Sequence, residues 1–366
     1  MKIQVIDASN PLWSETLEET LSHDFYHLPD YAALEARWIK AVPEAIRIEQ
    51  GDRLFFLPYL LRQCSPLFTE SPSDVFDVVS PYGYPGVLIN DAAAQDAEFL
   101  NQCMQALLQT FRDRHICSAF VRLHPILNQQ FADQYEGEGC SFHSETVSVD
   151  LTLPAEEIWR QTRPEHRNKI NKCKRAGFQA QVVPVETGLK SFMEIYTETM
   201  DRVGASQFYY FDDEYFLQLA QALGDRLHIC QAELDGQVAC AGLFTECSGI
   251  VQYHLGGTRN AFLKQSPMTL LFDFVRSWAK ERGNTSFHLG GGVGGAQDSL
   301  MHFKTGFSHQ RQRLFLLRLV VDPSIYQSLV ELRAKSLNTS AEQLLDSTFF
   351  PAYRSLDTEV SKATCN

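Results

Sequence analysis

The residues best suited to chemistry follow a glycine-rich run in the last third of the chain. Residues 290–295 read Gly-Gly-Gly-Val-Gly-Gly, so only Val293 carries a side chain there. Glycines let a backbone bend freely and lie close to a ligand. Phe303 and Lys304 come shortly afterwards, and a bare backbone beside a fixed cation could hold a substrate and stabilise developing negative charge. The structural alternative is a plain glycine turn next to a solvated lysine.

Two further candidates end a strand predicted at residues 249–255. Tyr253 and His254 would face the glycine run if this strand pairs with the one that precedes the run, although ordinary strand aromatics are the alternative. Gly290, Gly292 and Gly295 match the spacing of a dinucleotide-binding loop. Such a loop opens a helix and is followed about 20 residues later by an acidic side chain. Neither feature occurs here, so we reject a Rossmann site.

A cluster of basic residues lies between residues 160 and 175. Thr162 and Glu165 have the spacing of a capping box, which predicts that a helix begins there. His166, Ile170 and Cys173 would form its buried stripe. The basic side chains would cover the rest of the helix: Arg163, Arg167, Lys169, Lys172, Lys174 and Arg175. This helix could bind phosphates, or it could be a solvated, lysine-rich face.

Composition limits the class of protein. The chain has 366 residues, 44% hydrophobic and 21% charged, with a formal net charge of −13. These values are typical of a globular protein of about two domains. The acidic balance argues against a broad basic surface for nucleic acid, but not against a local patch. Nine scattered cysteines lack zinc-site spacing, so no metal is expected. Neither a signal peptide nor membrane insertion is predicted, and we expect a cytoplasmic protein.

The predicted elements repeat in the same order in the two halves of the chain. The first half has a hairpin at residues 45–62, a turn-rich loop at 80–86, a long helix at 94–114 and a strand at 117–123. The second half has a hairpin at 226–245, a strand at 249–255, a helix at 267–281 and a strand at 286–289. This duplication predicts domains at residues 1–145 and 146–313. A tail at 314–366 would pack back towards the first domain, with about the last ten residues disordered.

Several motifs, in this order along the chain, resemble the FemAB-like branch of the acetyltransferase-like (GNAT) superfamily. They are Asp24–Pro29, Ser80–Gly86, Asp150-Leu151, Arg163–Gly177, Tyr196-x-x-Thr199-x-x-Arg202, Tyr253–Gly257 and Phe303-Lys304-x-x-Phe307. The resemblance covers most of the chain. It implies an α/β fold of two tandem GNAT-like acyltransferase domains related by duplication, with mixed sheets flanked by helices. The branch contains aminoacyl-tRNA-dependent peptidyltransferases that build peptidoglycan cross-bridges, and relatives that act on natural-product peptides.

The resemblance also implies roles for individual residues. It places Phe303 and Lys304 in the acyl-transfer site, with Tyr253 as a third catalytic candidate, and gives Arg202 the grip on a precursor phosphate. We also assign substrate binding to Tyr82, Tyr84, His254, Gly291 and Gly292. The basic residues to which we assign tRNA or phosphate binding are Arg163, Arg167, Lys169, Lys172 and Arg259. Family members often carry a second tyrosine where this chain has Leu255, so substrate contacts differ there.

An aminoacyl-tRNA ester is already activated, so an enzyme needs only to align an amine with the ester carbonyl and stabilise the oxyanion. The first hypothesis is therefore transfer from charged tRNA, as co-substrate, to an amine of a peptide, without a cofactor. The second is an acyl-CoA-dependent N-acyltransferase acting on an amino sugar or small amine, and the third is a non-catalytic binding protein. The loop before Pro267 lacks the Gly-x-Gly/Ala that cradles the pyrophosphate of coenzyme A. This absence, together with the basic helix, favours charged tRNA over acyl-CoA as the donor.

Overall fold

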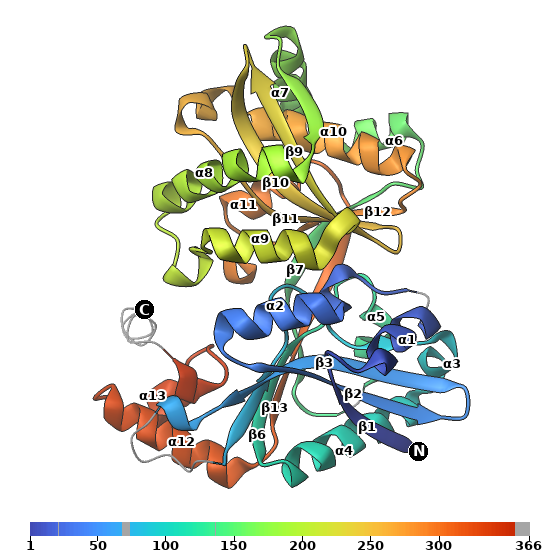
Figure 1. Ribbon diagram of the computed structural model, residues 1–366, viewed down its shortest axis with the longest axis vertical. Coiled ribbons are helices and arrows are strands. Elements are labelled where there is room, and N and C mark those ends of the chain that lie inside the picture. The colour runs from blue at the N-terminus through green and yellow to red at the C-terminus, as the bar shows by residue number, and fades with distance from the viewer. Residues whose placement is uncertain (21, 68–73, 136, 356–366) are drawn as a thin grey trace. The chain divides into compact units, whose positions relative to one another are not determined.

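The computed structural model describes residues 1–20, 22–67, 74–135 and 137–355 (Figure 1). The chain forms two compact units. Unit 1 comprises Met1–Ser22, Tyr26–His143 and Leu314–Asn366, and unit 2 comprises His23–Phe25 and Ser144–Arg313. The sequence placed the corresponding divisions at 145/146 and 313/314. The disorder predicted for the final residues lies outside the described part of the chain.

Unit 1 is a mixed sheet flanked by helices. Its strands are β1 (Lys2–Asp7), β2 (Val42–Gln50), β3 (Arg53–Gln63), β4 (Phe76–Val79), β5 (Leu88–Ile89), β6 (Ile116–Arg122) and part of β13 (Arg311–Val320). Its helices are α1 (Pro11–Glu19), α2 (Pro29–Ile39), α3 (Asp91–Ala94), α4 (Ala97–Asp113), α5 (Gln129–Gln134), α12 (Pro323–Ser336) and α13 (Ala341–Leu345). The strand order is β1-β2-β3-β4-β6-β13, with β5 pairing with β3.

Unit 2 is built in the same way. Its strands are β7 (Cys140–Asp150), β8 (Gln179–Val183), β9 (Leu227–Leu234), β10 (Gln237–Cys247), β11 (Ile250–Thr258) and β12 (Ser286–Gly290). Its helices are α6 (Ala155–Gln161), α7 (Pro164–Arg175), α8 (Val185–Val203), α9 (Asp213–Leu223), α10 (Pro267–Glu281) and α11 (Ser299–Lys304). The strand order is β7-β12-β11-β10-β9-β8.

The two units share one topology, which confirms the duplicated α/β architecture. In each, an antiparallel hairpin (β2-β3 or β9-β10) continues into a third antiparallel strand, β4 or β11. A long helix, α4 or α10, then leads to a strand parallel to that third strand, β6 or β12. Strands β7 and β13 each begin in one unit and end in the other.

Local sequence signals explain most element boundaries. Gly51 has a φ of 64°, and Gln50 pairs with Arg53 across the tight turn of the predicted hairpin. The helix predicted from residue 94 begins later, because the Asp96 carboxylate accepts a hydrogen bond from the Phe99 amide at 2.8 Å and so caps a helix that starts at Ala97.

The predicted capping box at the start of α7 is wrong. The helix begins at Pro164, and Arg163 is its N-cap residue without a side-chain cap. Thr162 instead ends α6, where its hydroxyl donates to Ile158 O at 3.1 Å and accepts from Arg276 Nη1 at 2.6 Å. The Thr162 hydroxyl therefore bonds to α6 and α10 rather than to the first turn of α7.

The core of unit 2 is aromatic and lies where the unit's α10 meets the strands. Phe272 of α10 contacts Phe287 of β12, Phe303 of α11 and Phe307, with ring centroids 5.2–5.8 Å apart. These edge-to-face and tilted contacts fix α11 against the sheet. Among the residues that the structure describes, none of the helices has both the length and the apolar character required to cross a bilayer.

Candidate functional site

Two parallel strands of unit 2 part at the site. β11 pairs with β12 only from Ile250 to Gln252, opposite Ser286 to His288. β12 pairs on its other side with β7, from Ser286 opposite Asp150 to Gly290 opposite Val147, while β11 continues without β12 past Gln252 to Thr258. Leu255 and Tyr253 of β11 pair with successive residues of β10. His254, which lies between them, is therefore the extra residue of a β-bulge. Bulges re-aim side chains and recur beside active sites. Tyr253 is the first β11 residue past the paired segment.

The glycine run follows β12 directly, and its glycines are required. Gly290 and Gly294 have φ angles of 75° and 60°, which side chains rarely adopt. A Cβ on Gly292 would lie 2.0 Å from the carbonyl oxygen of Ala296. The Asp298 carboxylate accepts from the amides of Val293 and Met301, at 3.0 and 2.8 Å, so it both closes the run and caps α11. The run therefore sets where α11 begins.

Lys304 ends α11 and turns back onto the glycine run. Its side chain is buried, with 5% of the residue exposed, and Nζ donates to Gly291 O at 2.6 Å. Nζ also lies 5.6 Å from the ring centroid of Tyr253, a cation–π distance. Burial lowers the pKa of Lys304 to about 7, against a smaller opposing effect of the Asp298 carboxylate. The amine is therefore held in one place and titrates near neutral pH.

Tyr253 of β11 contacts this amine, and Phe303 precedes Lys304 on α11. Burial raises the pKa of the Tyr253 phenol, which keeps it a hydrogen-bond donor at neutral pH. Phe303 packs against Phe272 and Phe307, with centroids 5.2 Å apart in each pair. The predicted triad of Lys304, Phe303 and Tyr253 thus comes from α11 and β11 of the same unit. Its assignment as catalytic stays a prediction.

The N-terminal part of α7 clamps the turn that follows Lys304. His166 is buried, and its Nε2 lies 2.9 Å from Phe303 O. Its ring packs against Phe303 and Phe307 at 5.4 and 4.8 Å. A Cβ on Gly306 would lie 2.4 Å from His166 Nε2, so only glycine fits beneath the ring. Burial lowers the pKa of His166, so the neutral ring donates from Nε2 to the carbonyl.

The basic residues predicted to bind phosphate have different surroundings. Arg163 reaches α11: Nη1 lies 2.8 Å from His302 Nε2, and Nη2 donates to Thr305 Oγ1 at 2.9 Å. Lys169 pairs with Glu165 at 2.6 Å. Arg167 is half-buried and Lys172 is exposed. The helix therefore combines a structural role at its start with free basic surface further along.

Arg202 and Arg259 lie together at the far end of β11. Arg202 Nη1 donates to Thr258 O at 2.9 Å and to Asn260 Oδ1 at 2.7 Å. Arg259 Nη2 pairs with Glu194 at 2.9 Å. Thr258 is five strand residues beyond Tyr253, about 16 Å along the strand. These two arginines therefore form a separate cluster from Lys304 within unit 2.

The remaining predicted residues are in other surroundings. Tyr82 and Tyr84 belong to unit 1, where Tyr82 O accepts from Tyr31 at 2.9 Å and the Tyr84 ring packs against Tyr26 at 6.0 Å. His254 is buried edge-on to Phe25 at 5.3 Å, and burial lowers its pKa to about 4. Gly291, by contrast, is at the site, since its carbonyl oxygen accepts from Lys304, as described above.

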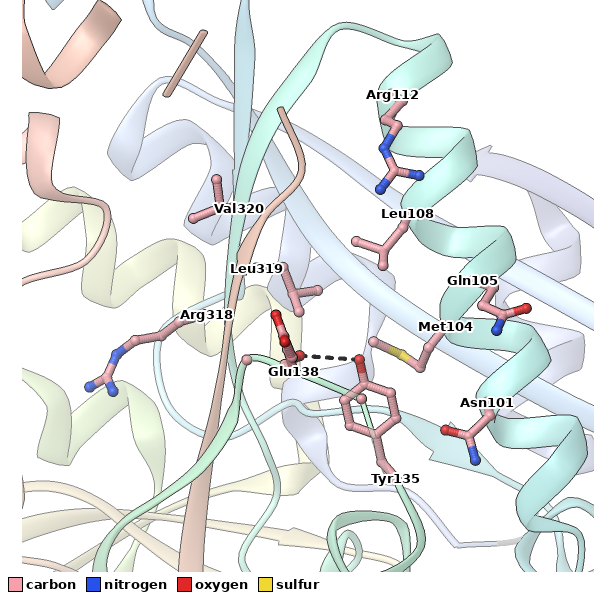
Figure 2. A pocket seen from close by; sticks show the side chains of 12 residues that line it. Asn101, Met104, Gln105, Leu108, Arg112, Tyr135, Glu138, Arg318, Leu319 and Val320 are labelled. Carbon is pink, nitrogen blue, oxygen red and sulfur yellow. Dashed lines mark hydrogen bonds between the residues drawn. The ribbon is translucent and has the colours of Figure 1, made fainter. Parts of the chain in front are cut away.

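A cavity of about 440 Å³ also lies in unit 1, between α4, the segment before β7 and β13 (Figure 2). Tyr135 on its wall donates to Glu138 O at 3.3 Å, the dashed line in Figure 2. Met104 and Leu108 contribute apolar surface, and the exposed Arg112 lies at one end. None of the predicted site residues lines this cavity, which therefore carries no part of the predicted chemistry. A pocket around Lys304 stays a prediction.

Sequence reasoning missed two residues that position Lys304. His166 was interpreted only as part of a buried stripe, and Gly306 only as part of a motif. The signal was present, because a histidine on an otherwise apolar stripe needs a hydrogen-bond partner when buried. Which carbonyl it meets depends on long-range packing, so spacing alone could not name Phe303 O.

Comparison with known proteins agrees with this architecture. Residues 160–305 match the acetyltransferase (GNAT) domain family, while no curated protein matches the sequence. The structure of FemX superimposes with a TM-score of 0.69 at 14% identity, over 90% of this chain and 99% of FemX. The C-terminal domain of a putative lysylphosphatidylglycerol synthetase from Agrobacterium fabrum gives 0.52 at 15% identity, over 83% of this chain and 92% of that domain. The L-PGS structure from Bacillus licheniformis gives 0.52 at 15% identity, over 85% and 91%.

At these identities the likeness establishes the fold. The predicted resemblance to the FemAB-like branch of the GNAT superfamily is confirmed at that level, as is the tandem, duplicated acyltransferase architecture. The chain therefore has the fold of FemX, and its residues 160–305 match the acetyltransferase (GNAT) domain family.

Proposed function

We propose that this acyltransferase forms an amide bond by moving an aminoacyl group from charged tRNA to an amine of a peptide. The observation that carries the proposal is the buried Lys304 amine, fixed 2.6 Å from Gly291 O at the end of the glycine run. The helix that clamps this element, α7, is also the basic helix. The fold likeness includes an enzyme named for a lysyl ester of a lipid, lysylphosphatidylglycerol synthetase. Aminoacyl transfer is therefore compatible with this architecture.

The proposed reaction needs little from the protein beyond alignment and charge stabilisation. The acceptor nitrogen attacks the ester carbonyl, the C–N bond forms, and the carbonyl oxygen becomes an oxyanion. The C–O bond to the terminal ribose then breaks, and the proton lost by the amine ends on the ribose hydroxyl. Lys304, as an ammonium with three N–H donors, uses one for Gly291 O and can offer another to the oxyanion. Tyr253 and Phe303 would bound the acyl group.

The other parts of the assignment follow from this reaction. The two units would be the domains predicted at 1–145 and 146–313, with the 314–366 segment completing the first. Charged tRNA would make the enzyme cytoplasmic. Arg202 remains the candidate for a phosphate of the acceptor, Tyr82 and Tyr84 remain candidates for its other groups, and Arg259 remains a candidate for tRNA or phosphate binding. The acceptor would be a cell-wall precursor or a natural-product type of peptide.

A transfer assay with two donors tests the proposal directly. Purified protein is incubated with a library of peptides and small amines, together with either charged tRNA or acyl-CoA. We expect labelled amide only from charged tRNA. The acetyltransferase (GNAT) match favours acyl-CoA as a second candidate donor, and product from acyl-CoA alone would make that candidate correct. The helix that would receive the pyrophosphate, α10, starts at Pro267, and its N-cap residue Ser266 makes no side-chain cap.

The pH dependence of the reaction should identify the active form of Lys304. Burial lowers its pKa to about 7, so the ammonium is complete below that pH and is lost as pH rises through it. If the ammonium stabilises the oxyanion, kcat/KM should fall on the alkaline side with a pKa near 7. Lys304→Arg, whose charge persists, should lose this limb even if its rate is lower. A rate that rises through pH 7 because of Lys304 would make the residue a general base instead.

Charge reversal on α7 should reveal whether the basic helix meets phosphates. Arg167→Glu should weaken tRNA binding and lower the slope of log K against log salt by about 1, the value for one lost phosphate contact. Lys190→Glu, on the exposed face of α8, is the matched control. Binding is measured by fluorescence anisotropy with labelled tRNA over a range of about 50 to 300 mM salt, in which the slope of log K against log salt is well determined. Equal affinities for both variants would leave α7 as a solvated face.

A further inference from the structure

Helices α6, α7 and α10 of unit 2 enclose an open groove that the predicted site does not use. Its volume is about 700 Å³. Helices α7 and α10, which both line it, pack against each other. The side chains that give it chemical character are Trp159, Asn171, Lys174, Asp273, Arg276 and Lys280. Three cations (Lys174, Arg276 and Lys280) and two carboxylates (Asp273 and Glu281) line it, a local positive excess in a chain whose net charge is −13.

Arg276 is the fixed centre of this groove. Its side chain is only 5% exposed, and it is held by two short bonds, from Nη1 to Thr162 Oγ1 at 2.6 Å and from Nη2 to Asp273 Oδ1 at 2.5 Å. A guanidinium has five N–H donors, so these bonds leave donors for a ligand in the groove that Arg276 lines. The other Asp273 oxygen accepts from Lys174 Nζ at 2.8 Å. The Asp273 carboxylate thus orients both Lys174 and Arg276, but its single negative charge neutralises only one of their two positive charges.

Trp159 adds an aromatic surface between these cations. The Arg276 guanidinium carbon lies 5.6 Å, and Lys174 Nζ 6.0 Å, from its ring. Lys280, one turn after Arg276 on α10, is tied by Nζ to Leu151 O at 2.7 Å and keeps two further N–H donors. A groove that combines several fixed cations with an aromatic side chain is how proteins bind single-stranded nucleic acid.

The groove continues a basic face of α7, on which Arg167 is half-buried and Lys174 is exposed. Arg167, Asn171 and Lys174 follow each other at helical spacings of four and three residues, so they share one face of the helix. This face covers about 10 Å from Arg167 to Lys174. At the start of the same helix, Arg163 bonds to His302 and Thr305 of the Lys304 element. A polymer of phosphates lying on this face would therefore run between the groove and that element.

We propose that the groove binds a phosphodiester segment of an RNA, namely the tRNA whose aminoacyl end would react at Lys304. This inference rests on the proposed function, because it assumes that RNA is the donor. An elongated basic face joined to an open groove favours a polymer over a single nucleotide, which would need only one phosphate site.

The test removes groove cations without touching the Lys304 element. Lys174→Gln/Lys280→Gln should weaken the binding of labelled, uncharged tRNA roughly ten- to hundredfold at 0.1 M salt and lower the salt slope by about 2. The matched control, Lys190→Gln/Lys335→Gln, removes two exposed lysines elsewhere and should bind like the wild type. If the groove double variant does not fold, Asn171→Glu, at an exposed position of the same groove, should weaken binding in the same direction.

The outcomes separate this inference from the proposed function. If wild-type protein binds tRNA and transfers from it, but the groove variants match the control, the RNA groove is wrong and the proposed function stands. If wild-type protein binds no tRNA and uses acyl-CoA instead, both are wrong. The last experiment measures whether uridine diphosphate or coenzyme A competes with tRNA for the protein. Tight binding of either one that is lost in the groove variants would overturn the RNA assignment in favour of a free nucleotide.

Discussion

Replacing Lys304 with methionine should lower turnover by ~10²–10³ while leaving tRNA affinity nearly unchanged. Methionine keeps an unbranched, apolar stem of similar length, so packing against Tyr253 and the glycine run is largely retained. What disappears is the donor to the oxyanion, whose loss costs ~2.7–4 kcal/mol in the transition state. The measurement is single-turnover transfer from charged tRNA at pH 6.5, below the lowered pKa of Lys304, which is about 7.

The same variant should not be less stable than the wild type. Burial disfavours the Lys304 ammonium, since its pKa is lowered to about 7, so removing that charge relieves a cost at and below this pH. Lys190→Met, on the exposed surface of α8, controls for loss of a lysine and should keep full activity. Full activity in Lys304→Met would remove Lys304 from the mechanism. A large fall in Tm would attribute the lost activity to folding instead.

Replacing Gly306 with alanine should destabilise the protein by about 1–3 kcal/mol, the usual cost of overpacking, and reduce turnover by roughly tenfold. The added Cβ would lie 2.4–2.6 Å from three atoms of the His166 ring, which is buried and cannot swing into solvent. Either the ring or the turn after Lys304 must move, and His166 then loses Phe303 O. Denaturant unfolding measures the stability, and kcat measured separately from KM measures the positioning.

A double-mutant cycle distinguishes this clamp from general damage. In a His166→Ala background the space beneath the ring is already open, so Gly306→Ala should then cost much less than in the wild type. His166→Ala alone should lower stability and kcat, because Phe303 O loses its donor and the rings of Phe303 and Phe307 lose a packing partner. Additive costs in the double variant would show that His166 and Gly306 act independently, and the clamp would be refuted.

The sequence predicted elements well where local signals were strong. Helix α10 spans Pro267–Glu281 as predicted, because proline suits the first helical turn and Gly283, with a φ of 86°, suits the residues just past the end. No helix or strand was predicted between residues 178 and 225, although α8 and α9 lie there. The apolar residues of α8 are interspersed with charged ones, and its burial depends on packing over β11 and neighbouring strands.

Some features of the candidate site were likewise predicted from the sequence, whereas others depended on the tertiary structure. The glycine run, the Phe303-Lys304 pair and Tyr253 were predicted, and the structure brings Lys304, Gly291 and Tyr253 together. Tyr82 and Tyr84 were predicted from a motif alone, and they belong to unit 1 rather than to the unit that carries Lys304. A motif records the order of residues along the chain, but it does not determine which compact unit receives them.

Composition, periodicity and motifs by themselves determined that this is a duplicated α/β protein with a basic helix and a lysine beside a glycine run. They could do so because helix caps, glycine turns and apolar stripes act over a few residues. Only the tertiary structure decided that Lys304 is buried with a pKa lowered to about 7, that His166 fills the space above Gly306, and that Arg276 is fixed in a groove with Trp159. Each of these depends on desolvation or on contact between residues far apart in sequence, and neither is encoded in local spacing.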